Sequence, residues 1–110
     1  MPDELAAAKC QPCAKGSKPL TDEEADALLR QLPEWSREGS CIARTFRFKN
    51  YHETMAFVNA TAWISHREDH HPDLTVGYQQ CRVVYSTHAV AGLSRNDFIC
   101  AAKLDALLSL

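Results

Sequence analysis

The sequence of 110 residues predicts an α+β fold, a four-stranded antiparallel sheet with helices packed on one face. Three helix-start signals occur, at Thr21, Asn50 and Ser94, each followed three residues later by an acidic residue. Two pairs of short runs with alternating apolar and polar residues lie between them, as in strands joined by tight turns. The predicted order is helix, two strands, helix, two strands, helix (αββαββα).

The chain divides into an N-terminal arm, residues 1–20, and a globular domain, residues 21–110. The arm has weak helical character at its start, and Pro and Gly residues then interrupt any regular element. It carries Cys10 and Cys13 in a Cys-x-x-Cys pattern, but a zinc site would need two further ligands. The five cysteines do not resemble a disulfide framework. We expect this pair not to be catalytic, and adventitious metal binding or oxidation stays open as its role.

The first half of the domain begins with a helix after Thr21, which Pro33 stops. A short strand opens at Trp35, and a turn at residues 38–40 leads into a second strand over residues 42–48. One face of that second strand is apolar except for Arg44. The helical stripe and this strand face together supply part of the predicted core: Ala25, Leu28, Leu29, Leu32, Ile42, Phe46 and Phe48.

The second half of the domain begins with the longest helix, over residues 51–69, followed by strands over residues 74–78 and 81–87 and a terminal helix after Ser94. Two adjacent apolar rows are expected on the long helix: Met55, Val58 and Ala62 beside Phe57 and Ile64. Along the last strand, alternation puts Cys81, Val83, Tyr85 and Thr87 on one face, and helices packed on one side of the sheet would bury the apolar stripes.

Histidines gather at the end of the long helix. His66, His70 and His71 fall within six positions, and His88 follows the last strand. Imidazole exchanges protons near neutral pH and also binds metals. Because Pro72 ends the helix, His70 and His71 should leave its end together, and we expect them to line one solvent-open cleft with His88.

A metal site is the alternative interpretation of this cluster. His66 and His70 stand four residues apart on one helical face, and His71 or His88 would be a third ligand. The pattern lacks the Glu that follows the first His in metalloproteases. We therefore favour a site without metal.

Composition excludes several other classes of function. Hydrophobic content of 45% with 24% charged residues is typical of a soluble domain. A net charge of −2 gives no general attraction to nucleic acid or anionic lipid. No apolar run is long enough for a membrane span or a signal peptide, so we expect a cytoplasmic protein.

The spacing of the rare residues resembles the pterin-4a-carbinolamine dehydratase family over about residues 20–110. The family pattern begins with an acidic, basic or histidine residue. Three further residues separate it from His-His-Pro, and an aromatic residue, a histidine and an aspartate follow at set distances. The positions that match it are His66, His70, His71, Pro72, Tyr78, His88 and Asp97. His66 departs from the glutamate that is more usual there.

The resemblance implies removal of water from 4a-hydroxytetrahydropterin to give quinonoid dihydropterin, without metal, nicotinamide or other cofactor. It implies that His70 and His88 form the acid/base pair and that His71 contacts and orients the pterin. It also suggests substrate contacts for His66 and Asp97, although Asp97 would equally serve as a capping partner of Ser94. For Tyr78 we expect a core role in packing the turn.

The resemblance also implies partners. Members of the family form homodimers or homotetramers, and they recycle the cofactor of aromatic amino-acid hydroxylases such as phenylalanine hydroxylase. Some act as dimerisation cofactors or transcriptional coactivators. A regulatory protein-binding module is therefore the alternative to an enzyme.

Overall fold

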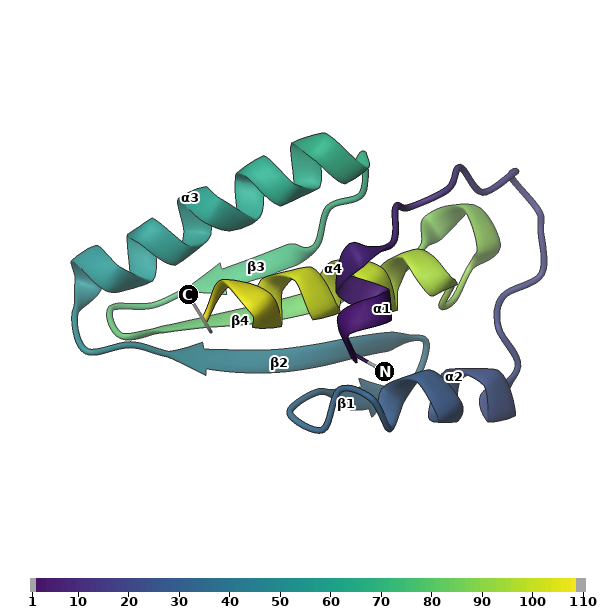
Figure 1. The fold of residues 1–110 in the computed structure, drawn as a ribbon, viewed down its shortest axis with the longest axis horizontal. Helices are drawn as coiled ribbons and strands as arrows, with labels where there is room; N and C mark the ends of the chain where they lie inside the picture. The colour runs from purple at the N-terminus through teal and green to yellow at the C-terminus, as the bar shows by residue number, and fades with distance from the viewer. Residues whose placement is uncertain (1, 109–110) are drawn as a thin grey trace.

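The computed structural model describes the fold of residues 2–108 and the side chains of residues 4–108 (Figure 1). The αββαββα order is confirmed, and the structure adds α1 before it and the 3₁₀ helix η1 before α4. The elements are α1 (Pro2–Ala7), α2 (Asp22–Leu29), β1 (Ser36–Glu38), β2 (Cys41–Arg47), α3 (Tyr51–Glu68), β3 (Asp73–Val76), β4 (Gln80–Tyr85), η1 (His88–Val90) and α4 (Arg95–Leu107).

The sheet has the strand order β1-β2-β4-β3, and every neighbouring pair is antiparallel. The two predicted hairpins, β1-β2 and β3-β4, thus lie side by side through the pairing of β2 with β4. Phe46 stands opposite Cys81 in that pairing, and Ile42 stands opposite Tyr85. Side chains alternate between the two faces of a strand, so this register gathers the apolar residues of both central strands on one face.

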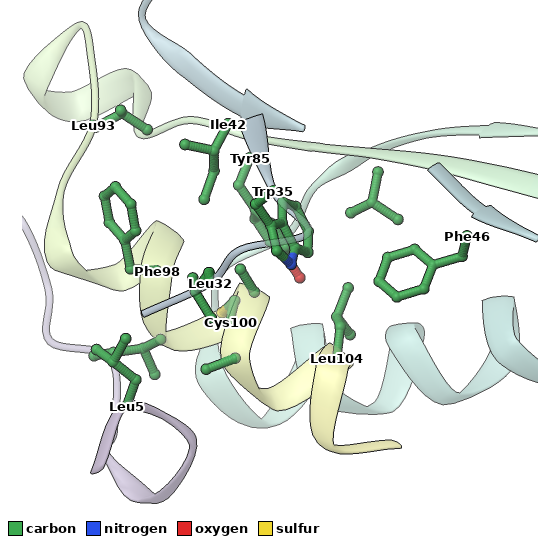
Figure 2. Close-up of a cluster of buried hydrophobic side chains, with 14 of the residues drawn as sticks. Leu5, Leu32, Trp35, Ile42, Phe46, Tyr85, Leu93, Phe98, Cys100 and Leu104 are labelled. Carbon is green, nitrogen blue, oxygen red and sulfur yellow. The ribbon is translucent and has the colours of Figure 1, made fainter. Parts of the chain in front are cut away.

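The core lies between that face and the helices (Figure 2). Alternate residues of β4 are fully buried, as the sequence predicts, and α4 is buried over most of its length. One hydrophobic cluster includes Leu32, Trp35, Ile42, Phe46, Phe57, Cys81, Val83, Tyr85, Phe98 and Leu104. The predicted packing of helices on one face of the sheet is confirmed.

The buried face of α3 agrees with the predicted apolar rows at Phe57, Val58 and Ile64 but differs from them at other positions. Thr54, Phe57 and Thr61 are buried, whereas Ala62 is exposed. Both threonines are satisfied locally, because the Thr54 hydroxyl donates to the Asn50 carbonyl at 3.0 Å and the Thr61 hydroxyl to the Val58 carbonyl at 2.7 Å. A polarity pattern does not register these bonds, which explains why the prediction misses the two buried threonines.

Tyr78 is not a core residue, so that prediction is wrong. Its side chain is 68% exposed and stacks on the ring of Tyr51, with the centroids 6.0 Å apart. The turn is held instead through the backbone, because the Tyr78 carbonyl lies 3.0 Å from the Thr54 hydroxyl, which shares its single proton between this carbonyl and that of Asn50.

The N-terminal segment packs on the rest of the molecule. Leu5 of α1 is 1% exposed and belongs to the core cluster, and the Lys103 ammonium on α4 donates to the Ala6 carbonyl at 2.6 Å. Farther along, the Gly16 N–H donates to the Ala89 carbonyl at 2.9 Å. The division between an arm and a domain at residue 20 stays a prediction.

Arg44 breaks the apolar face of β2 because it has a partner on α4. Its Nη1 lies 2.7 Å from Asp105 Oδ1, and the Trp35 indole donates to the same oxygen at 2.9 Å. The guanidinium also lies 4.2 Å from the ring centre of Phe46. Burial raises the pKa of the Asp105 carboxyl, and the bonds from Trp35 and Arg44 oppose this shift without cancelling it.

We predict that Arg44→Met destabilises the fold by about 1–3 kcal/mol at neutral pH, because it leaves a half-buried carboxylate without its cation. The loss should shrink towards acid pH. The pKa of Asp105 is raised in the folded state, so between pH 3.8 and that raised pKa the folded state binds more protons than the unfolded state, and stability falls as pH rises. At the acid end of this range the carboxyl is protonated and no longer needs the cation. Urea unfolding at several pH values measures this.

The matched control for this prediction is Arg47→Met on the same strand, where the guanidinium is exposed and bonds to Gln80. Equal losses for the two variants, or a loss for Arg44→Met that does not change with pH, would contradict the account of Asp105.

Candidate active site

A cavity of about 500 Å³ lies where the end of α3, the end of β4 and the start of α4 meet, a size typical of small-molecule sites. Three of the five histidines line it, His70, His71 and His88. The other lining residues are Cys10, Gln11, Pro12, Cys13, Arg67, Glu68, Asp69, Ser86, Thr87, Ala89 and Asn96.

The end of α3 turns the tandem histidines into the cavity. Asp69 adopts the left-handed conformation, with φ of 51°, and the His70 N–H returns to the Ser65 carbonyl at 3.2 Å. Aspartate tolerates this conformation better than most residues that have a Cβ atom. Pro72 then keeps the chain from re-entering the helix. The helix therefore ends where the sequence predicts.

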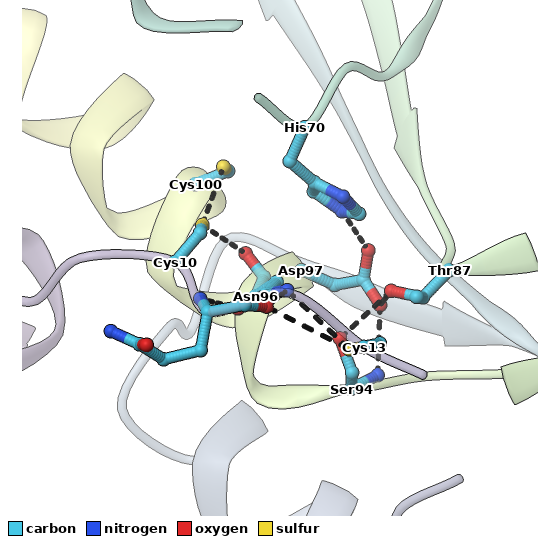
Figure 3. A network of polar contacts seen from close by, with 9 residues as sticks. Cys10, Cys13, His70, Thr87, Ser94, Asn96, Asp97 and Cys100 are labelled. Carbon is cyan, nitrogen blue, oxygen red and sulfur yellow. Dashed lines mark hydrogen bonds and ion pairs between the residues drawn. The ribbon is translucent and has the colours of Figure 1, made fainter. Parts of the chain in front are cut away.

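His70 binds a buried carboxylate (Figure 3). Its Nε2 lies 2.6 Å from Asp97 Oδ1, and the Asp97 side chain is fully buried. Asp97 Oδ2 accepts two further bonds, from the Thr87 hydroxyl at 2.8 Å and from the Ser94 N–H at 2.9 Å. Asp97 thus caps α4, as weighed for it from sequence, and contacts His70 at the same time.

Hydroxyl groups extend this network. Because the Thr87 hydroxyl donates to Asp97, it accepts the hydrogen bond from the Ser94 hydroxyl, 2.8 Å away. The His70 ring also stacks on Tyr85 at a centroid distance of 5.8 Å and an interplanar angle of 10°. His70 is therefore held on two sides, by a carboxylate and by an aromatic face, and its side chain is only 12% exposed.

His71 and His88 differ from His70 in their surroundings. Both are exposed, and neither imidazole forms a hydrogen bond within the described part of the chain. His88 begins η1 rather than ending a strand, because β4 stops at Tyr85. Both rings are thus open to a ligand in the cavity.

His66 lies outside this set. It is exposed on α3, beside Trp63 at a ring distance of 5.9 Å, and it does not line the cavity. The helix ends before His70, so the two histidines do not continue one helical face. Among residues 4–108, no group of three or more His, Cys, Asp or Glu side chains is placed to hold a metal ion. No helix among the described residues is long and apolar enough to cross a membrane.

Sequence reasoning missed several residues of the cavity. Strand alternation assigns Thr87 to one face of the last strand and does not predict that it lines the cavity. Its place just before His88 is the signal that could have placed it there. Asn96 and Glu68 carry no local signal, because their partners in the arm are distant in sequence. Nothing local in the sequence places Cys10 and Cys13 beside the histidines.

Comparison with known proteins gives a consistent match. The family model described as "Pterin 4 alpha carbinolamine dehydratase" matches residues 18–107. Two relatives are each named "Putative pterin-4-alpha-carbinolamine dehydratase". The one from Nitrosospira multiformis is 59% identical over 98% of this chain and 96% of its own length. The one from Nitrosomonas eutropha is 63% identical over 96% of this chain and 94% of its own.

A solved structure agrees with these sequence matches. The crystal structure of a transcriptional coactivator/pterin dehydratase from Brucella melitensis superposes with a TM-score of 0.79 and 29% identity. The match covers 82% of this chain and 98% of that chain. By sequence and by fold, the chain belongs to the pterin-4-alpha-carbinolamine dehydratase family.

Proposed function

We propose that the protein removes water from a 4a-hydroxytetrahydropterin to give the quinonoid dihydropterin, and so recycles the cofactor of an aromatic amino-acid hydroxylase such as phenylalanine hydroxylase. Family membership supports the substrate class. The single observation that carries the mechanism is the contact of His70 with the buried Asp97 carboxylate, at the wall of a cavity shared with His71 and His88.

The reaction needs one acid and one base. The C4a–O bond breaks, and the departing hydroxyl takes a proton to leave as water. The electron pair of the N5–H bond forms the new C4a–N5 double bond, and a base takes the N5 proton. Positioned general acids and bases each contribute about 10²–10⁴-fold to such steps. Two histidines near neutral pH supply both functions, and no redox or hydride transfer occurs.

His70 suits the role of the acid. An ionised Asp97 accepts a hydrogen bond from Nε2–H, which fixes the tautomer and leaves Nδ1 to exchange a proton with the substrate. The carboxylate stabilises the imidazolium, as in catalytic triads. The aromatic face of Tyr85 keeps the ring plane in one orientation. In this scheme His70 protonates the leaving hydroxyl.

His88 then acts as the base that takes the N5 proton, since its exposed ring has no partner within the described residues. His71, equally exposed, contacts and orients the pterin ring. Asp97 is fully buried, which favours a positioning role through His70 over a direct substrate contact. A substrate contact by His66 stays a prediction, with less support because His66 lies outside the cavity lining.

The first test is stopped-flow dehydration of a 4a-hydroxytetrahydropterin by purified protein and its histidine variants. We expect His70→Ala and His88→Ala each to lower kcat by about 10²–10⁴-fold, because each removes one proton-transfer group. The double variant should approach the uncatalysed rate. His71→Ala should act mainly on KM, because it removes a binding contact.

His52→Ala is the control, because His52 is exposed on the first turn of α3 and outside the cavity. His66→Ala should also change little if only the lining residues contact substrate. Wild-type rates for both His70→Ala and His88→Ala between pH 6 and 8 would rule out the assignment.

A second prediction concerns Asp97→Asn. The amide keeps the shape and an acceptor for the Ser94 N–H but removes the charge behind His70. We expect kcat to fall by about 10²–10⁴-fold with KM nearly unchanged, because the tautomer and charge of His70 would no longer be fixed. Thermal melting should show that the variant is folded. Asp73→Asn, at an exposed position on β3, is the matched control, and equal kcat values for the two variants would exclude the positioning role.

A third prediction concerns association. β1 and β3 form the two edges of the sheet, and exposed strand edges favour pairing with another chain. We expect a homodimer or homotetramer, so light scattering at micromolar concentration should give at least twice the chain mass of 12.3 kDa. A mass of a single chain across that range would refute it.

The Brucella melitensis protein is named a transcriptional coactivator as well as a pterin dehydratase, which motivates a second candidate function, coactivation through protein binding. This role would not need the acid/base histidines. A protein without dehydratase activity that still binds a transcription factor would support it over the enzyme.

A further inference from the structure

We propose that residues 10–13 of the N-terminal arm form one wall of the pterin site and contact the bound pterin. This inference rests on the proposed dehydratase function. It also extends the site beyond the region matched by the family model, which begins at residue 18.

The first observation is the shared cavity. Cys10, Gln11, Pro12 and Cys13 line the same space as His70, His71 and His88. The segment is distant from the histidines in sequence, so only the fold brings the two groups together. A ligand that fills the cavity in front of the histidines must therefore lie close to the arm.

The second observation is the clamp that Asn96 forms on this segment (Figure 3). The Gln11 N–H donates to Asn96 Oδ1 at 2.9 Å, and Asn96 Nδ2 donates to the Gln11 carbonyl at 2.7 Å. The Asn96 amide also lies 3.6 Å from the sulfur of Cys13. Asn96 is itself 8% exposed, so the side chain that forms both bonds is buried. The backbone of the arm is thus held by paired bonds, as in a strand pairing.

Cys10 provides a second anchor next to the clamp. Its N–H donates to Glu68 Oε1 at 2.8 Å, and its sulfur lies 3.5 Å from that of Cys100. The contact with Cys10 is the larger cause and burial the smaller cause of a raised pKa of the Cys100 thiol, so Cys100 stays neutral. The Glu68 carboxylate is 7% exposed and lies 3.9 Å from the Lys103 ammonium. The arm therefore holds a charged side chain at the end of α3 in place.

The two halves of the site are positioned from one helical turn. Asn96 holds the arm, and its neighbour Asp97 holds His70, both on the first turn of α4. A shift of this turn would move the wall and the acid together. The distance between the arm and His70, which a bound pterin ring must match, is therefore set by the first turn of α4.

The arm also offers chemistry that fits a pterin. Gln11 is exposed, and its side-chain amide forms no hydrogen bond within the described residues. An amide presents one acceptor and two donors. The pyrimidine part of a pterin presents an amino group, a ring N–H and a carbonyl, which pair with those groups. We assign Gln11 as the recognition residue of this wall.

The experiment is a footprint on the wild-type protein. Cys13 is alkylated with iodoacetamide with and without saturating 7,8-dihydrobiopterin, and mass spectrometry follows each cysteine. Cys41 is the internal control, since it is similarly half-exposed but lies on β2 outside the cavity. We expect the pterin to slow alkylation of Cys13 several-fold and to leave the rate at Cys41 unchanged.

Binding of the same pterin is measured separately by fluorescence titration. Binding without protection of Cys13 would overturn this inference and leave the dehydratase proposal intact. Absence of any binding would overturn both.

A pair of variants makes the assignment sharper. Gln11→Ala should weaken 7,8-dihydrobiopterin binding by about five- to tenfold, the effect of losing a hydrogen bond to the ligand. Gln80→Ala, an exposed glutamine at the far end of β4, should bind as the wild type does. Equal affinities for the two variants would exclude Gln11 as a contact.

Discussion

The buried carboxylate of Asp97 is the constraint on which the rest of the site depends. A charge that is removed from water destabilises a fold by several kcal/mol unless hydrogen bonds and charges surround it. Here the partners come from three places in the chain: His70 beyond α3, Thr87 beyond β4, and the Ser94 N–H at the start of α4. Satisfying one carboxylate therefore requires three segment ends to meet at one point. The cavity is the space that this convergence leaves open.

In the proposed enzyme, this arrangement makes the stability of the fold and the chemistry depend on the same residues. The same side chain caps α4 and holds the ring of His70, so a change made for one purpose alters the other. Asn96, its neighbour, extends the pattern to the N-terminal arm through two short bonds to Gln11. In the proposed enzyme, one helical turn then sets both the position of the acid and the wall opposite it.

Much of the fold follows from local patterns in the sequence. The capping box at Thr21 and the cap at Asn50 start helices as predicted, although Glu53 bonds to the Lys49 N–H instead of the Asn50 N–H. Alternation along β4 gives its buried face correctly. Such signals work because caps and strand faces depend on neighbours close in the chain. The cluster of histidines likewise depends on the helix end at Pro72.

Tertiary contacts account for what the sequence did not predict. Thr54 and Thr61 can be buried because their hydroxyls bond to backbone carbonyls, and Tyr78 stacks on the exposed ring of Tyr51 instead of entering the core. The arm looks irregular by composition, yet Leu5 enters the core and Cys10 contacts Cys100. These contacts join residues far apart in the chain, and no local rule encodes them.

The most direct measurement of the central claim is the tautomer of His70, read by long-range ¹H–¹⁵N NMR at a pH where the ring is neutral. The account predicts the proton on Nε2, facing Asp97. A proton on Nδ1 would contradict it.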